Sequence, residues 1–96
     1  MEKDKRLNRL RFRAWHRGTK EADLMLGGFI DRAGQGLDEA AIAWLEQLLE
    51  QSDIDIMAWI TGAKPVPAAF DTPLMARMQK LDYIPTNPRH QAKGEI

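Results

Sequence analysis

The chain has 96 residues, of which 44% are hydrophobic and 29% charged, a composition that fits one small globular domain. It contains no cysteine, which excludes disulfides, thiolate catalysis and cysteine-ligated metal sites, and its two histidines, His16 and His90, lack metal-ligand spacing. The formal net charge is zero but unevenly spread. Residues 1–20 carry eight Lys or Arg against two acidic residues, residues 21–59 carry nine acidic residues against one Arg, and residues 60–96 carry five basic residues against three acidic ones. We expect this split to steer association with a partner of complementary charge.

No apolar run is long enough to span a bilayer, and the N-terminus lacks the apolar core of a secretory signal. Glu2 and Asp4 also argue against an acid-poor transit peptide. We therefore expect a cytoplasmic chain that does not insert into membranes.

The first predicted element is a helix over about residues 3–16. At about 100° per residue, one face gathers Leu7, Leu10 and Ala14, and we expect Phe12 and Trp15 to widen this buried face. The opposite side is predicted to carry a basic stripe of four arginines: Arg6, Arg9, Arg13 and Arg17.

A charged corner is predicted over residues 16–23, between the first two helices. Gly18 can end the first helix and Thr19 can cap the second. Arg17 offers a planar fork of donors, while Glu21 and Asp23 offer carboxylates. We expect a contact surface here. The alternative is a solvated face on which the arginines pair with the two carboxylates across the corner.

The second helix is predicted over about residues 20–32, with a buried face of Ala22, Met25, Leu26, Phe29, Ile30 and Ala33. Its other side contains two adjacent glycines, Gly27 and Gly28, which cost roughly 1 kcal/mol each inside a helix. One interpretation is close packing against a neighbouring helix. The other is a flattened outer surface where a partner backbone docks near an exposed Leu24.

Three further helices are predicted, each introduced by a capping residue. They run from the cap Asp38 to about residue 51, from the cap Ser52 to Thr61 with Gly62 as the stop, and from the cap Thr72 to about residue 81. Trp44 and Trp59 lie at helical spacing among aliphatic residues and are predicted to be core. A Pro-rich segment over residues 64–67 is predicted to be an extended connector.

No strand-like alternation or internal repeat appears in the sequence. We predict an all-α fold, a small single-domain bundle of five short helices over residues 1–84, followed by a flexible C-terminal tail over residues 85–96 that includes His90.

The residues do not favour catalysis. Glu21 and Asp23 are two apart on a helix and point in different directions, and the single serine, Ser52, is a helix cap. No glycine-rich phosphate-binding loop is present. A helical nucleic-acid-binding or regulatory module that uses the arginine stripe is the alternative function, although the acidic middle of the chain and a pI of about 6.7 argue against a polyanion partner.

Two blocks of the sequence resemble a known family. Arg17-Gly18-x-x-Glu21-x-Asp23 runs into residues 24–29, and residues 52–62 form a second, acidic block that leads to tryptophan and glycine. Together they resemble the signature of the succinate dehydrogenase flavinylation and assembly factor family, called SdhE in bacteria and assembly factor 2 in mitochondria. The resemblance covers about residues 5–82. Thr19 is a departure, since many members carry methionine after the glycine.

The resemblance implies a chaperone-like, non-catalytic factor. It would bind the flavoprotein subunit of succinate dehydrogenase, with fumarate reductase as a further candidate client, and promote covalent attachment of FAD to a client histidine. FAD would then belong to the client, with none held stably by this chain, and we expect no nucleic-acid partner and a monomer when free. The expected partner-binding residues are Arg13, His16, Arg17, Gly18, Glu21, Asp23 and Leu24.

Overall fold

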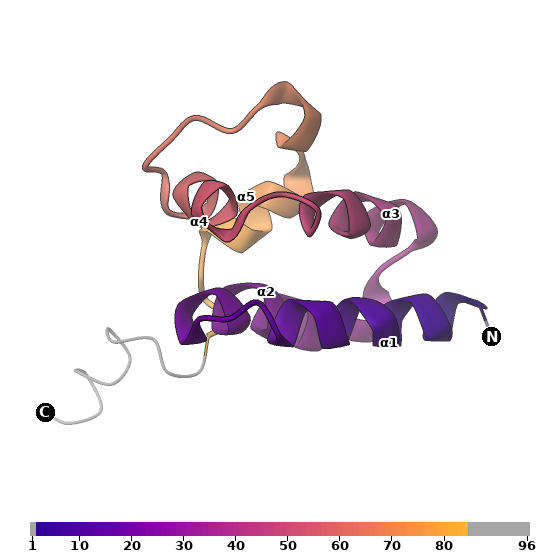
Figure 1. Ribbon diagram of the computed structural model, residues 1–96. Coiled ribbons are helices and arrows are strands. Elements are labelled where there is room, and N and C mark those ends of the chain that lie inside the picture. Colours follow the sequence, from indigo (N-terminus) through magenta and orange to yellow (C-terminus); the bar gives the residue numbers. More distant parts are fainter. Residues whose placement is uncertain (1, 85–96) are drawn as a thin grey trace, which may run out of the picture.

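The computed structural model describes residues 2–84, which form five α-helices and two short 3₁₀-helices (Figure 1). The elements are α1 Glu2–Trp15, α2 Lys20–Ala33, η1 Gly34–Gly36, α3 Glu39–Leu48, α4 Asp53–Thr61, η2 Ala68–Phe70 and α5 Pro73–Gln79. Helices α1 and α2 lie side by side in one layer, and α3, α4 and α5 form a second layer across them (Figure 1). The predicted all-α fold of five short helices is confirmed. The tail predicted over residues 85–96, with His90, lies outside the described residues.

Helix starts follow from local sequence, as predicted. A side-chain oxygen at the N-cap of each of α2 to α5 accepts a hydrogen bond from the backbone N–H three residues later, which contributes about 1 kcal/mol per cap. The caps are Thr19, Asp38, Ser52 and Thr72. Gly62 ends α4 in the left-handed conformation with φ +84°. Over residues 2–84, no helix is both long and apolar enough to cross a membrane.

One hydrophobic core fills the space between the two layers. Each helix contributes residues from its predicted apolar face, including Leu7, Leu10 and Ala14 from α1, Leu26, Phe29 and Ile30 from α2, Ile42, Leu45 and Leu48 from α3, Ile56, Trp59 and Ile60 from α4, and Met75 and Met78 from α5. The core role predicted for Trp59 is confirmed. Trp44 is only half-buried, with its ring edge-to-face against Phe70 at 6.2 Å between centroids.

Phe12 is not part of the core, contrary to the prediction. Its exposed fraction is 65%. At about 100° per residue, Phe12 lies roughly 140–160° around the helix from Leu7, Leu10 and Ala14, so that it projects away from the second layer.

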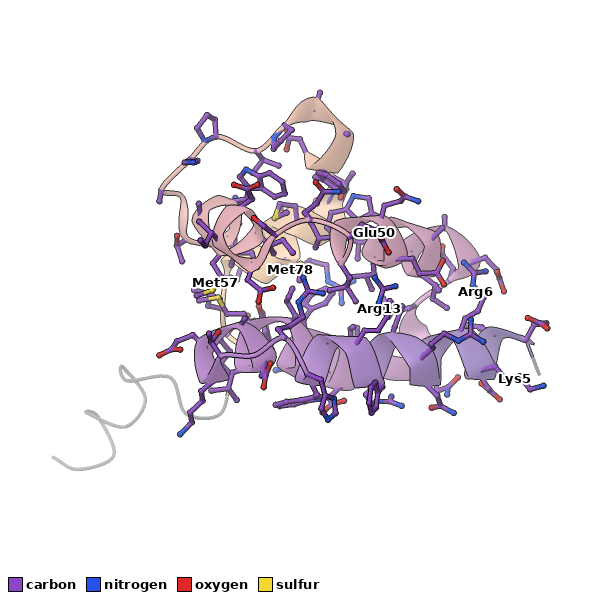
Figure 2. The ribbon with its side chains drawn as sticks, in the orientation of Figure 1. Lys5, Arg6, Arg13, Glu50, Met57 and Met78 are labelled. Carbon is purple, nitrogen blue, oxygen red and sulfur yellow. The ribbon has the colours of Figure 1, made fainter. Side chains whose placement is uncertain are left out.

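Part of the basic stripe differs from the prediction, because Arg6, Arg13 and Arg17 face the second layer, whereas Arg9 is exposed. Arg6 and Arg13 lie roughly 80° around α1 from the apolar face at about 100° per residue, which brings them to the edge of α3. Arg6 binds Glu39 at 2.6 Å and Glu46 at 2.8 Å, and Arg13 binds Glu50 at 2.8 Å (Figure 2). The hydrogen bond from Arg6 lowers the pKa of Glu46 below its ordinary value. Basic residues of segment 1–20 and acidic residues of segment 21–59 therefore form ion pairs between the two layers.

Neither glycine of α2 lies on an outer docking surface, and Gly27 serves close packing, which confirms that interpretation for Gly27. Both are buried. A Cβ on Gly27 would lie 2.4 Å from a ring carbon of Trp15, so the indole occupies the space a side chain would need. A Cβ on Gly28 would lie 3.5 Å from the ring of Tyr83, an ordinary contact. The indole over Gly27 is held by a hydrogen bond of 3.1 Å from its Nε1 to Asp31.

Helix α3 ends earlier than predicted, at Leu48, because the backbone tightens there. The amides of Glu50 and Gln51 donate to carbonyls only three residues back, at 3.1 and 2.9 Å. The tightened turn leads directly to the cap of α4 at Ser52. Helix α5 is likewise displaced from its predicted range, ending at Gln79, and Leu81 has a positive φ of 54°.

Candidate functional site

The predicted corner lies between the last turn of α1 and the first turn of α2. Gly18 has φ +116°, a backbone conformation that side chains with a Cβ rarely adopt, and nothing lies within 4 Å of the position a Cβ would take. Glycine is therefore required here by the backbone and not by packing. The residue is exposed, which leaves its backbone open to another molecule.

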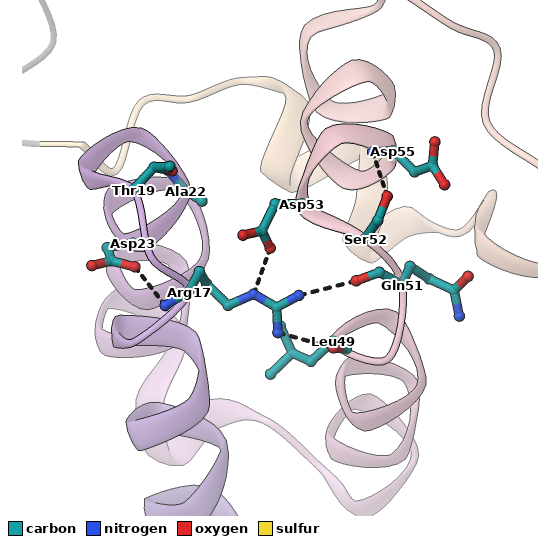
Figure 3. A network of polar contacts seen from close by, with 9 residues as sticks. All are labelled: Arg17, Thr19, Ala22, Asp23, Leu49, Gln51, Ser52, Asp53 and Asp55. Carbon is teal, nitrogen blue, oxygen red and sulfur yellow. Dashed lines mark hydrogen bonds and ion pairs between the residues drawn. The ribbon is translucent and has the colours of Figure 1, made fainter.

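Arg17 points inward and connects the corner to the turn between α3 and α4 (Figure 3). Its Nε donates to Asp53 Oδ1 at 2.7 Å, Nη1 donates to the Leu49 carbonyl at 2.9 Å, and Nη2 donates to the Gln51 carbonyl at 3.0 Å. The side chain is 13% exposed. A cation is favoured at this place because the last carbonyls of α3 have no partners within the helix. The guanidinium holds the two layers together at one end of the molecule.

The carboxylates of the corner have different roles. Asp23 Oδ1 accepts a hydrogen bond of 2.8 Å from the backbone N–H of Arg17 and so fixes the chain as it enters the turn. Glu21 is exposed and forms no hydrogen bond or ion pair with any residue in the range 2–84. The alternative interpretation, in which the Arg17 side chain pairs with Glu21 and Asp23 across the corner, is wrong. The Arg17 guanidinium binds Asp53 in their place.

An open hollow of about 600 Å³ lies on the outer side of the corner. Four predicted site residues line it, namely His16, Gly18, Asp23 and Leu24, and they are joined by Trp15, Thr19 and Lys20. Arg13 lies apart from the hollow, at its ion pair with Glu50. Helical periodicity places Trp15 at the edge of the apolar face of α1, beside the corner, and the structure shows that it forms part of this surface.

His16 lies at the rim and caps the C-terminal end of α1. Its Nδ1 is 2.6 Å from the Phe12 carbonyl oxygen, and its ring stacks on the Phe12 ring with 4.1 Å between centroids. Because a carbonyl can only accept, Nδ1 carries the proton, and in the neutral ring Nε2 is an acceptor. The exposed Phe12–His16 pair thus adds an aromatic surface beside the hollow.

The corner presents polar and charged groups that are not engaged elsewhere within residues 2–84. It offers an unengaged carboxylate at Glu21, an ammonium at Lys20 and an open backbone at Gly18. Among residues 2–84, no group of three or more His, Asp or Glu side chains is arranged to hold a metal ion. The chemistry available is hydrogen bonding, charge pairing and apolar contact.

Comparison with known proteins adds a second line of evidence. The family model described as "Flavinator of succinate dehydrogenase" matches residues 8–82. The chain is 37% identical over 73 residues to the FAD assembly factor SdhE of Acetobacter pasteurianus, covering 76% of this chain and 67% of that protein. It is 35% identical over 66 residues to the mitochondrial succinate dehydrogenase assembly factor 2 of Mycosarcoma maydis, covering 69% of this chain and 28% of that protein. The corresponding protein of Drosophila grimshawi is 32% identical over 77 residues, covering 78% of this chain and 52% of that protein. The chain thus spans two thirds of the bacterial relative and about half or less of these two mitochondrial proteins.

Proposed function

The chain belongs to the family of succinate dehydrogenase flavinators, and we propose that it acts as an FAD assembly factor. In this role it binds the flavoprotein subunit of succinate dehydrogenase and promotes covalent attachment of FAD. The observation that carries the proposal is the family match over residues 8–82, a range that contains both the corner and the α3–α4 turn to which Arg17 connects it.

Such a factor needs no catalytic residue of its own. The bond to FAD would form between the flavin and a client residue, and the factor would contribute only binding energy. To accelerate that step it must bind the reactive conformation of the client more tightly than the others. A tenfold difference in affinity corresponds to about 1.4 kcal/mol and shifts the two populations tenfold.

We propose that the corner has a part that contacts the client and a part that supports it. Gly18, Glu21 and Leu24 are the residues we assign to contact with the client, because they are exposed or line the hollow and their polar groups are unengaged. We assign Arg17 and Asp23 to positioning, since the Asp23 carboxylate is bound to the Arg17 backbone N–H and the Arg17 guanidinium is bound to the α3–α4 turn. This division refines the expectation that all of them face the client.

The remaining expectations complete the proposal. We propose that the chain holds no FAD stably, since its sequence has no phosphate-binding glycine loop. We propose fumarate reductase as a further client, and we propose that the free protein is a monomer. We also propose that it acts in the cytoplasm, which its similarity to a bacterial assembly factor supports. A nucleic-acid partner is disfavoured because Arg6, Arg13 and Arg17 are already bound by carboxylates.

The test is covalent flavin on the client, measured by in-gel fluorescence after co-expression of the flavoprotein subunit with wild-type chain, with each variant or without the chain. Wild type should increase covalent flavin over its absence. Glu21→Gln keeps the size of the side chain and removes its charge, and Gly18→Arg blocks the open backbone; both should lower the signal severalfold. Glu2→Gln, an exposed glutamate at the far end of α1, is the matched control and should act as wild type.

Two results would contradict the proposal. Equal covalent flavin with and without the chain would refute the assembly function. Normal flavinylation by folded Glu21→Gln and Gly18→Arg variants would leave the family function intact but remove the corner from it.

A further inference from the structure

A second hollow lies where the end of α5 crosses the C-terminal half of α2, at the other end of α2 from the corner. Its volume is about 180 Å³. Three cationic side chains line it, Arg32, Arg77 and Lys80, against one acidic residue, Asp82. Phe29 and Tyr83 form its aromatic wall.

The aromatic wall holds the hollow in a fixed shape. The Arg77 guanidinium carbon lies 5.5 Å from the centroid of the Phe29 ring, a cation–π arrangement. The Phe29 ring meets the Tyr83 ring edge-to-face at 5.4 Å, and the Tyr83 hydroxyl donates to the Met25 carbonyl at 2.9 Å. Arg77 is therefore positioned before any ligand arrives, which reduces the entropy cost of binding.

The three cationic side chains of this hollow form no ion pair within residues 2–84. The side chains of Arg32 and Lys80 are exposed and form no hydrogen bond there, and the side-chain N–H donors of Arg77 are likewise unused. Asp82 lines the same hollow without an ion pair. By contrast, Arg6 of α1 and Arg17 of the corner are both bound by carboxylates within the fold.

We propose that this hollow binds an acidic segment of a protein partner, with a carboxylate side chain received by Arg77, Arg32 and Lys80. The guanidinium fork matches a carboxylate in two parallel hydrogen bonds, and the hollow has room for one or two such groups. A nucleic-acid strand is disfavoured because residues 21–59, with nine acidic residues and one Arg, would repel its further phosphates. With the partner taken as the flavoprotein subunit, the inference rests on the proposed function and adds a second contact to the corner.

The first experiment measures the affinity of the full chain for the purified flavoprotein subunit at 50, 150 and 500 mM NaCl. Arg32→Glu/Lys80→Glu reverses two charges that form no ion pair within residues 2–84, and it should weaken binding at least tenfold and flatten the salt dependence. Lys5→Glu/Lys64→Glu, an exposed pair without partners in residues 2–84, makes the same change of net charge elsewhere and should stay within twofold of wild type. If the two double variants weaken the affinity equally, or if neither changes it, the proposed binding site is refuted.

The second experiment separates failure of the site from failure of the proposed function. If wild type does not bind the flavoprotein subunit, the function fails, and the hollow is judged by NMR titration with hexaglutamate. Shifts at the side-chain N–H groups of Arg77 and Arg32, absent in Arg32→Glu/Lys80→Glu, would support the site. Shifts with inorganic phosphate alone, tighter binding of a single-stranded oligonucleotide, or no shifts would overturn it.

Discussion

Replacement of Arg17 by alanine is expected to lower the free energy of unfolding by about 3 kcal/mol. The charged hydrogen bond to Asp53 contributes roughly 1.5 kcal/mol or more, and the two bonds to the carbonyls of Leu49 and Gln51 contribute about 0.5–1 kcal/mol each. Because Arg17 and Asp53 are 13% and 25% exposed, water compensates only part of the loss. For a domain of this size, 3 kcal/mol corresponds to a decrease in Tm of about 12–24 °C.

Thermal and urea unfolding followed by circular dichroism would measure this change. Arg13→Ala is the matched control, since it removes a nearby arginine of α1 whose single ion pair with Glu50 is more exposed, and it should cost less than about 1 kcal/mol. Arg17→Lys should fall between the two variants, because a lysine keeps the charge but not the planar fork. If Arg17→Ala lowers the free energy of unfolding no more than Arg13→Ala, the contacts of Arg17 with the α3–α4 turn do not stabilise the fold as described.

The other predictions concern packing and titration. Gly27→Ala places a Cβ against the indole ring of Trp15 and should destabilise the fold by about 1–3 kcal/mol, whereas Gly28→Ala should be tolerated. Urea unfolding of the two variants measures the difference, and equal stability would contradict the packing described for Gly27. Arg6 lowers the pKa of Glu46 below its ordinary value of 4.5. The ionised Glu46 therefore stabilises the fold above pH 4.5, and this stabilisation is lost as the pH falls below that value. Glu46→Gln should flatten the acid side of a plot of unfolding free energy against pH. Burial raises the pKa of Tyr83, the single tyrosine, above its ordinary value of 10. The tyrosinate absorbance at 295 nm should therefore stay low as the pH passes 10 and rise only when the protein unfolds. Titration of Tyr83 near pH 10 in the folded protein would refute its burial.

The elements of this fold could be predicted from sequence because their signals are local. Thr19, Asp38, Ser52 and Thr72 each satisfy an N–H three residues along the chain, so spacing alone locates the start of each helix. The apolar faces followed from helical periodicity in the same way.

The destination of the Arg17 side chain could not be predicted on this basis. Its partners lie 32 to 36 residues further along the chain, and no periodicity links the two segments. The family resemblance covers both sequence blocks, the one that begins at Arg17 and the one over residues 52–62. It does not indicate that Arg17 binds Asp53 at the start of the second block. Gly27 gave a partial signal, since a glycine inside a helix indicates close approach, but Trp15 as the covering group is a tertiary fact.

The bridge formed by Arg17 has a consequence for any attempt to reduce this protein to a short mimic. A synthetic helical hairpin of residues 2–33 would contain every residue of the corner, including Gly18 and Glu21. It would lack the carbonyls of Leu49 and Gln51 and the carboxylate of Asp53, so its arginine would be free to rotate into solvent. A minimal ligand that imitates the corner must therefore also supply the α3–α4 turn, or replace it with a covalent staple.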